Sequence, residues 1–247
     1  MIGFLIFRLT DLFSQNLKNE YQKIVINFIN QVKNNNKDNI SNMISYPFHR
    51  DYPIKSIKDK KEFISRYDEI FDDSLKYKII KSNPAKDWAE VGWRGIMLYR
   101  GDLWLDFDGR ISSINYQSKS ERLLKEKTIE TDRKNIHPSL LKFESPVCIL
   151  KTSKYLIRID LLGKEKYRYA SWSITKSMID KPDLVINNGE CIYEGSGGNH
   201  SYKFQNDGYI YECSIIIMGE EGSPPAILTV SKGDKDLIIQ NATIEEK

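Results

Sequence analysis

Histidine, cysteine and long apolar runs are scarce in this chain of 247 residues. Three cysteines are too few for a dense disulfide scaffold, and no Cys-x-x-Cys pair suggests a zinc site, so no metal or cofactor is predicted. No apolar run reaches the roughly 18 residues that a membrane-spanning helix needs. The composition is that of a globular protein, 40% hydrophobic and 29% charged. The length suits one large domain or two of about 100 residues.

The charge is weak and evenly spread. The chain carries 37 basic and 34 acidic residues, a net charge of +3, and residues 143–247 alone carry 12 basic and 15 acidic residues. Nucleic-acid-binding proteins usually gather Lys and Arg on one face or along one helix. No such block is present, so nucleic acid is not expected as a partner.

Residues 1–15 leave two interpretations open. The apolar run Ile2–Phe7 is broken by Arg8 and has no basic residue before it, whereas a signal peptide begins with basic residues. The ending Phe13-Ser14-Gln15 resembles the cleavage ends of secreted bacterial proteins. We slightly favour a truncated signal or anchor segment on an exported (periplasmic or extracellular) protein. The alternative is a first element packed on the core of a cytoplasmic protein.

Apolar residues recur at helical spacing in segments 17–34 and 59–71, which predicts two amphipathic helices. Asp59 caps the second helix, because Glu62 follows it in capping-box spacing. A short helix is expected near 38–45. The expected buried stripe of the helix after Asp59 consists of Phe63, Ile64, Tyr67, Ile70 and Phe71.

After Ser74 the apolar residues alternate with a period of two, which predicts strands. The pairs Arg100-Gly101 and Asp108-Gly109 supply turns between them. Three helices followed by an antiparallel meander form an α+β layer arrangement. The expected strands are Leu75–Lys81, Trp88–Leu98, Asp102–Phe107 and Ile111–Gln117.

A set of segments follows a distinctive order along residues of about 17–117. They are the two first helices, Tyr46-Pro47-Phe48, Tyr67-Asp68-Glu69-Ile70-Phe71, Gly95–Leu98, Gly101–Leu105 and Ile114-Asn115. This order resembles the nuclear-transport-factor-2-like superfamily (SnoaL-like cone fold), and the resemblance implies a cone of helices on an antiparallel sheet. The superfamily includes ketosteroid isomerases, dehydratases, epoxide hydrolases, transport factors and non-enzymatic binding modules, so the fold leaves the function open.

A charged segment, 119–142, is expected to be a helix or linker between a cone-fold domain, 16–118, and an all-β domain, 143–247. Short strands separated by turn clusters predict an antiparallel sandwich or barrel for the second domain, which resembles no family that we recognise. Its expected strands are Val147–Leu150, Tyr155–Leu162, Tyr167–Trp172, Asp183–Ile186, Glu190–Tyr193, Tyr202–Phe204, Tyr209–Met218, Ile227–Ser231 and Leu237–Gln240.

The candidates for catalysis are His49, Asp51, Tyr67 and Asp106, because all four could reach the mouth of a cone-fold cavity. A carboxylate whose pKa is raised by burial is a common general base in such a cavity. The spacing of these residues matches no catalytic relative, and ordinary surface ion pairs explain them as well. We therefore expect a binding protein rather than an enzyme.

Binding candidates lie in three places. One is the segment after Pro47, and another is the predicted meander, where Trp93 and Met97 would share one strand face. An exposed tryptophan row would form a binding surface or a homodimer contact, and a buried one would pack on the core. The third place is a glycine loop that no helix follows, so it lacks the helix N-terminus of a phosphate site. The candidates are Arg50, Trp93, Arg94, Trp104, Gly197, Asn199 and His200.

Two cysteines, Cys191 and Cys213, lie in predicted strands and could form a disulfide if the strand register places them opposite each other, leaving Cys148 unpaired. Buried free thiols are the alternative.

These observations favour a non-enzymatic, exported two-domain protein that binds or inhibits an unknown protein or small-molecule ligand. The alternatives are an isomerase or dehydratase that uses the cone cavity, and a cytoplasmic interaction module. A cavity filled by side chains would favour binding, and an open one with a buried carboxylate would favour catalysis.

Overall fold

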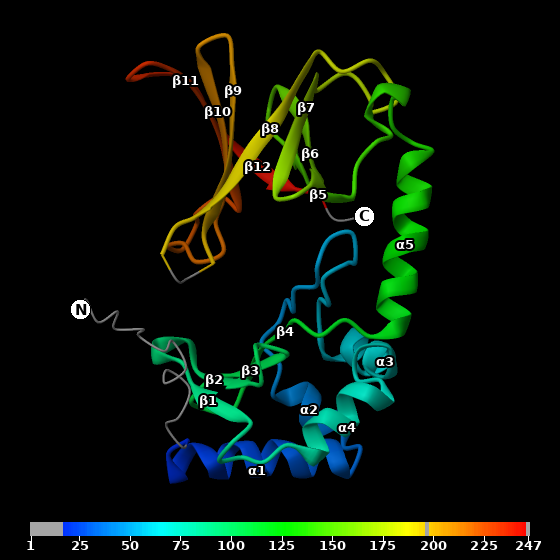
Figure 1. The fold of residues 1–247 in the computed structure, drawn as a ribbon, viewed down its shortest axis with the longest axis vertical. Helices are drawn as coiled ribbons and strands as arrows, with labels where there is room; N and C mark the ends of the chain where they lie inside the picture. The colour runs from blue at the N-terminus through cyan, green and yellow to red at the C-terminus, as the bar shows by residue number, and fades with distance from the viewer. Residues whose placement is uncertain (1–16, 196–197, 246–247) are drawn as a thin grey trace, which may run out of the picture. The chain divides into compact units, whose positions relative to one another are not determined.

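The computed structural model describes residues 17–195 and 198–245 (Figure 1). They form two compact units: unit 1 contains residues 17–50 and 56–123, and unit 2 contains residues 51–55 and 124–245. Helices accompany two separate sheets, which confirms the α+β class. The predicted leader or anchor segment, 1–15, lies outside the described residues.

Aspartate side chains cap the starts of two helices of unit 1. The Asp59 carboxylate accepts the Glu62 N–H at 2.8 Å, and the Asp72 carboxylate accepts the Leu75 N–H at 2.9 Å. Each cap satisfies an N–H that has no partner within the helix. The four helices are α1 (Asn19–Lys33), α2 (Lys37–Asn42), α3 (Lys60–Ile70) and α4 (Asp73–Lys81).

The predicted strand Leu75–Lys81 is wrong, because this segment is helix α4. Leu75 and Ile79 are fully buried, whereas Tyr77 between them is 65% exposed. Apolar residues at positions i, i+2 and i+4 fit a strand, but i and i+4 alone also fit one face of a helix. The cap at Asp72 settles this ambiguity in favour of the helix.

The sheet of unit 1 is an antiparallel meander of four short strands in the order β1-β2-β3-β4. The predicted continuous strand Trp88–Leu98 is wrong, because a 3₁₀ turn, η1 (Gly92–Arg94), interrupts it. After this turn Gly95 has φ +104°, and a Cβ there would lie 2.3 Å from the Leu105 carbonyl oxygen. The strands are β1 (Trp88–Glu90), β2 (Ile96–Leu98), β3 (Leu103–Leu105) and β4 (Ile111–Ile114).

Unit 2 is built around a closed barrel of eight antiparallel strands, in which each strand pairs with the next and β12 pairs with β5 (Figure 1). Of the two architectures predicted, sandwich or barrel, the structure has the barrel. The strands are β5 (Ser145–Lys151), β6 (Tyr155–Gly163), β7 (Lys166–Ser173), β8 (Leu184–Tyr193), β9 (His200–Asn206), β10 (Tyr209–Ile215), β11 (Ala226–Lys232) and β12 (Lys235–Ile244).

The two predicted strands Asp183–Ile186 and Glu190–Tyr193 are one strand, β8. The Asn187-Asn188-Gly189 triplet between them is not a turn, because the pairing with β7 shifts there and Asn188 takes φ +64° within the strand. Gly189 gives room to an aromatic ring of the barrel interior, since a Cβ at this position would lie 2.1 Å from the Phe204 ring. Turn-forming residues therefore serve a bulge and close packing here.

Helix α5 (Lys119–Arg133) belongs to unit 1 at its start and to unit 2 from residue 124 onward. Within unit 2, its last turns and residues 134–143, which include the 3₁₀ helix η2 (Pro138–Leu140), cover the outer face of β6 and β7. Ile129 and Leu140 from this cover pack with Ala170 and Trp172. We call residues 124–143 the cover segment.

Four charged side chains are buried beneath the cover segment: Asp132 from α5, Arg158 and Asp160 from β6, and Arg168 from β7. None has a side chain more than 5% exposed. Arg158 pairs with Asp132 at 2.5 Å and with Asp160 at 2.6 Å, and Asp160 pairs with Arg168 at 2.6 Å. Two positive and two negative charges thus balance each other out of contact with water.

The disulfide suggested for Cys191 and Cys213 is not formed, and all three cysteines are free. Both residues lie opposite Tyr202 of β9, from the neighbouring strands on its two sides. Two strand spacings separate their backbones by roughly 10 Å, beyond the roughly 4–7 Å between the Cα atoms of a disulfide.

Ellman's reagent is therefore expected to label Cys191 first at pH 8, well ahead of the other two thiols. Cys191 is half-buried, whereas Cys148 and Cys213 are buried, with 7% and 0% of their surface exposed. Burial raises the pKa of the Cys148 thiol to about 12 and that of Cys213 above its ordinary value, so little reactive thiolate forms. Mass spectrometry of the labelled peptides over time checks the order in which the thiols react. In urea all three thiols should react with the reagent. Fewer than three in urea would contradict the free-thiol assignment.

Candidate functional site

Arg50, predicted to bind a ligand, is instead buried within unit 1. Its guanidinium contacts both carboxylate oxygens of Glu121, at 2.6 and 2.7 Å, and only 3% and 1% of the two side chains are exposed. It also donates to the carbonyl oxygens of Ile114 and, at 3.0 Å, Tyr116. Because its guanidinium donates to these partners, Arg50 links the start of α5 to the end of the sheet, and its side chain is not accessible to a ligand.

His49, Asp106 and Tyr67 each have a partner outside the set of catalytic candidates. The Nδ1 of His49 lies 3.3 Å from the Ser56 hydroxyl. Burial, aided by Asp108, raises the pKa of the Asp106 carboxyl, whose hydrogen-bond partner is Ser112 in the same hairpin. Asp51 belongs to the short segment assigned to unit 2.

Tyr67, the fourth catalytic candidate, is a core residue. It is fully buried and stacks on Phe71 with ring centroids 4.9 Å apart. Its hydroxyl has no hydrogen-bond partner in the described part of the chain, and burial raises the pKa of the phenol above its ordinary value. Tyr67 therefore stays protonated and packed at neutral pH.

The expected shared strand face of Trp93 and Met97 does not exist, because Trp93 lies in the 3₁₀ turn and Met97 in β2. Trp93 is 59% exposed. The Arg94 guanidinium lies 5.4 Å from the centre of the Trp104 ring, a cation–π distance, so these two candidates do come together.

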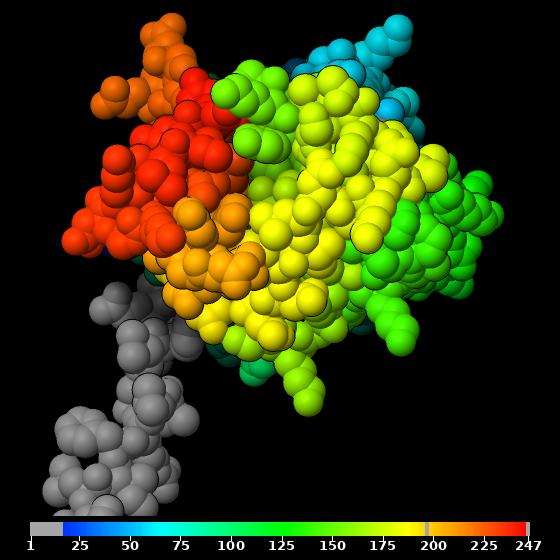
Figure 2. All heavy atoms as spheres, turned by 90° about the horizontal axis from the view of Figure 1, so that it is seen from above, coloured from blue at the N-terminus to red at the C-terminus, as the bar shows by residue number. Residues whose placement is uncertain are grey.

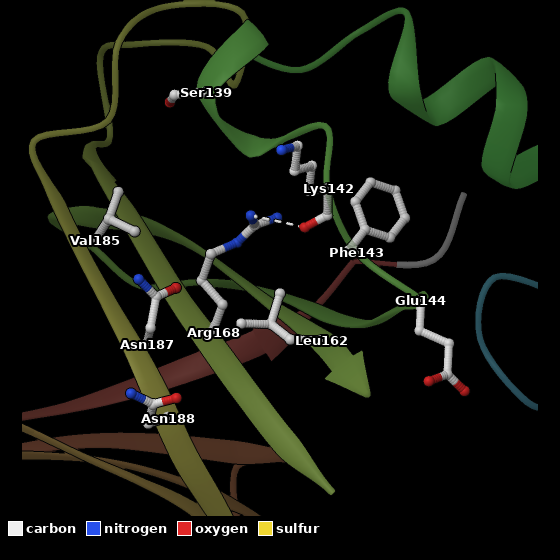
Figure 3. Close-up of a pocket in the computed structure, with 9 residues that line it drawn as sticks. All are labelled: Ser139, Lys142, Phe143, Glu144, Leu162, Arg168, Val185, Asn187 and Asn188. Atoms are coloured by element: carbon white, nitrogen blue, oxygen red, sulfur yellow. Dashed lines mark hydrogen bonds between the residues drawn. The ribbon is translucent and has the colours of Figure 1, made fainter. Parts of the chain in front are cut away.

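A groove of about 820 Å³ lies on the outside of the barrel, between the end of the cover segment and β8 (Figure 3). Its lining contains two cationic side chains that could attract an anion, Lys142 and Arg168, and of these Arg168 is buried. Its guanidinium already donates to the Leu140 and Lys142 carbonyl oxygens, at 2.6 and 3.2 Å, and its charge is balanced by Asp160. The Glu144 carboxylate points away from Arg168 (Figure 3). The Arg168 guanidinium therefore holds the groove's own backbone and carboxylate groups together.

Asn199 holds together two loops at one end of the barrel. Its side-chain oxygen accepts the N–H groups of Ile217 and Met218 at 2.9 and 2.8 Å, and its side-chain nitrogen donates to the Met218 carbonyl oxygen at 2.9 Å. Asn199 lies in the β8–β9 connection, and Ile217 and Met218 lie in the β10–β11 connection. The side chain of Asn199 therefore joins the two connections by hydrogen bonds at a point where the backbone pairing of the strands has ended.

His200 begins β9 directly after this clamp. Its Nδ1 donates a hydrogen bond to the Gly198 carbonyl oxygen at 2.8 Å, and its ring packs edge-on against Tyr202 and beside Tyr193. Both Asn199 and His200, predicted as binding residues, thus shape the loops. Gly197, the third candidate of this loop, lies outside the described residues.

Three exposed apolar side chains surround the Asn199 clamp, and the sequence-based prediction missed all of them. Tyr193 is 73% exposed, and Ile217 and Met218 are each 56% exposed. The run Ile215–Met218 was predicted as the end of a strand, but β10 stops at Ile215. The signal that could have revealed them is the Gly219-Glu220-Glu221-Gly222 sequence, which is typical of a loop.

The described residues contain no group of three or more His, Cys, Asp and Glu side chains that could hold a metal ion. None of the helices in those ranges combines the length and apolar character needed to cross a membrane. Compared with known proteins, the chain matches no family model, no curated protein and no solved structure.

Proposed function

We propose that this protein is a non-enzymatic binding protein that docks on another protein through the two clamped loops of the barrel. The loop pair is defined as residues 192–195, 198–200 and 216–222. The observation that carries the proposal is the Asn199 clamp, which fixes both loops while three large apolar side chains beside it stay exposed.

Exposed apolar groups on ordered loops are a usual feature of protein-binding surfaces. Large side chains such as Tyr193 supply contact area with few rotatable bonds. Loops that are already ordered lose less conformational entropy when they bind, which leaves more of the contact energy as affinity. The hydrogen bonds of Asn199 provide that order here.

The charge of the loop pair favours a basic partner. It contains Glu194, Glu220 and Glu221 and no Lys or Arg. Residues 143–247 also carry a net charge of −3. A partner that surrounds an apolar patch with basic residues would complement this surface, because its apolar patch would meet the exposed apolar side chains and its basic residues would meet the glutamates.

The interior of unit 1 supports binding over catalysis. Phe63, Tyr67, Phe71 and Trp88 are fully buried and fill its core with aromatic rings. Unit 1 is also proposed to have the cone fold, which its helices and its four-stranded meander support.

The tagged double variant Ile217→Ser/Met218→Ser is expected to retain at least about tenfold less of the partner protein than the unsubstituted chain does. The reason is that exposed apolar anchors dominate such interfaces. The matched control is Ile239→Ser, because Ile239 is 63% exposed on β12 away from both loops. Quantitative mass spectrometry compares the proteins retained by each variant. Both variants should melt close to the unsubstituted chain, as surface substitutions usually do.

The partner retained by the chain should be basic and should be released as salt is raised, because charge steering is screened. A partner that is captured equally by both variants, or that is acidic and insensitive to salt, would contradict the docking surface.

A further inference from the structure

The end of the barrel opposite the loop pair holds a cavity of about 320 Å³. It lies where β6, β10 and β12 begin and where β7 and β11 end, and Figure 2 looks onto this end of unit 2. An eight-stranded barrel is wide enough either to be filled by its own side chains or to hold one small ligand. The lining residues that matter most are Tyr155, Tyr169, Ser171, Tyr209, Tyr211 and Val230.

The floor of the cavity is aromatic and closed. The rings of Tyr169 and Tyr211 lie 5.6 Å apart at 46°, and Tyr169 packs at 5.5 Å on Phe204, which belongs to the buried barrel core. Aromatic rings inclined in this way offer faces and edges to a flat guest. A flat ring system inserted here would therefore gain contacts on several sides.

The hydrogen-bonding groups of the lining include the hydroxyls of Tyr169, Ser171 and Tyr211. Ser171 interacts with the phenol of Tyr169, and both residues are buried. Burial raises the pKa values of the Tyr169 and Tyr211 phenols above their ordinary range, so both remain protonated at neutral pH. A protonated hydroxyl can both donate and accept, which suits hydroxyl and carbonyl groups of a ligand.

The lining carries no charge that is free for a ligand. Its one ionisable carboxylate is Asp183, which accepts the Ser173 N–H at 2.8 Å and pairs with Lys176. The ammonium of Lys232 lies 4.6 Å from the centre of the Tyr209 ring but is not part of the lining. A charged guest would lose its hydration without gaining an opposite charge, which is costly.

We propose that this cavity binds a small, uncharged molecule with a flat apolar ring system and one or two hydroxyl or carbonyl groups. The volume sets the size, since ligand pockets of about 300–1,000 Å³ are usual and this one is near the lower limit. The site is separate from the loop pair, so it does not depend on the docking function proposed above.

Three naphthalene probes of equal shape test the proposal on the full chain: neutral 2-naphthol, anionic 2-naphthoate and cationic 2-naphthylmethylammonium. Isothermal titration calorimetry should show 2-naphthol binding at least about tenfold more tightly than either ion, because burial of an unpaired charge is unfavourable. Equal binding of the three probes, or no binding of 2-naphthol, would overturn the proposal.

The matched variants are Val230→Phe and Thr229→Phe, neighbours on β11 that add the same ring. Val230 lines the cavity and is 6% exposed, whereas Thr229 is not part of the lining. Val230→Phe should weaken 2-naphthol binding at least about tenfold by filling the cavity, and Thr229→Phe should leave it within about twofold.

Amide chemical shifts of the unsubstituted chain decide the question even if Val230→Phe fails to fold. Addition of 2-naphthol should shift the amide signals of Ser171, Tyr211 and Val230. Shifts confined to Tyr193 and Met218, at the other end of the barrel, would overturn the assignment to the cavity and would leave the docking proposal untouched.

Discussion

Replacing Asp160 by alanine is expected to lower the free energy of unfolding of unit 2 by about 3–5 kcal/mol, because it leaves buried charge without a partner. Asp160 contacts both Arg158 and Arg168 at 2.6 Å, and neither it nor Arg158 is exposed at all. Loss of the carboxylate leaves two guanidinium groups opposed by Asp132 alone.

Hydrogen exchange measured by mass spectrometry across a urea series gives the stability of peptides from β6 and β7 separately from those of unit 1. The control is Lys166→Ala, which breaks a pair with Glu190 whose side chains are 45% and 65% exposed. That exposed pair is expected to contribute little to stability, because water and salt screen it. A similar small loss in Asp160→Ala would show that the buried cluster is hydrated or dispensable.

The buried cluster could not be predicted from the sequence. The alternation in Tyr155–Leu162 indicates a strand, and it places Arg158 and Asp160 on the face opposite Ile157 and Ile159. Alternation does not say what covers that outer face. The cover comes from residues 124–143, whose charged composition suggested a linker or helix but gave no sign of which barrel strands it would pack on.

Elements with a local chemical signal were predicted well. The helix after Asp59 follows from its cap and its apolar stripe, and both are present in α3. The segment Leu75–Lys81 was mistaken because its apolar residues fit two periods and the capping Asp72 was not recognised. Where a strand is interrupted by a single turn, as at Gly92–Arg94, its ends depend on its pairing with the neighbouring strands of the sheet. The sequence shows such an interruption only by a glycine.

The sequence singles out only part of the proposed loop pair. The glycine loop drew attention to Asn199 and His200, and both lie at the loop pair. Their roles depend on Ile217 and Met218, which lie 18 and 19 residues further along the chain. Sequence spacing cannot show that two connections of a barrel meet, since that depends on the strand register.

Replacing Phe63 by alanine is expected to lower the free energy of unfolding of unit 1 by about 3–5 kcal/mol. Phe63 is fully buried in α3 and packs edge-on against Tyr67 and Phe71, with ring centroids 5.9 and 6.2 Å away. The stacked pair that Tyr67 and Phe71 form would lose its third ring, and the cavity left behind could close only by moving the helix. The loss thus combines apolar transfer with the cost of the cavity.

Thermal melting and the urea series on peptides of α3 measure this loss, and Tyr77→Ala provides the control. Tyr77 is also an aromatic residue on a helix of unit 1, but it is 65% exposed, so its removal should change stability by no more than about 0.5 kcal/mol. If Phe63→Ala melts within a degree or two of the unsubstituted chain, the stripe of α3 does not form the core. A loss that spreads equally to the barrel peptides would instead mean that the two units unfold together.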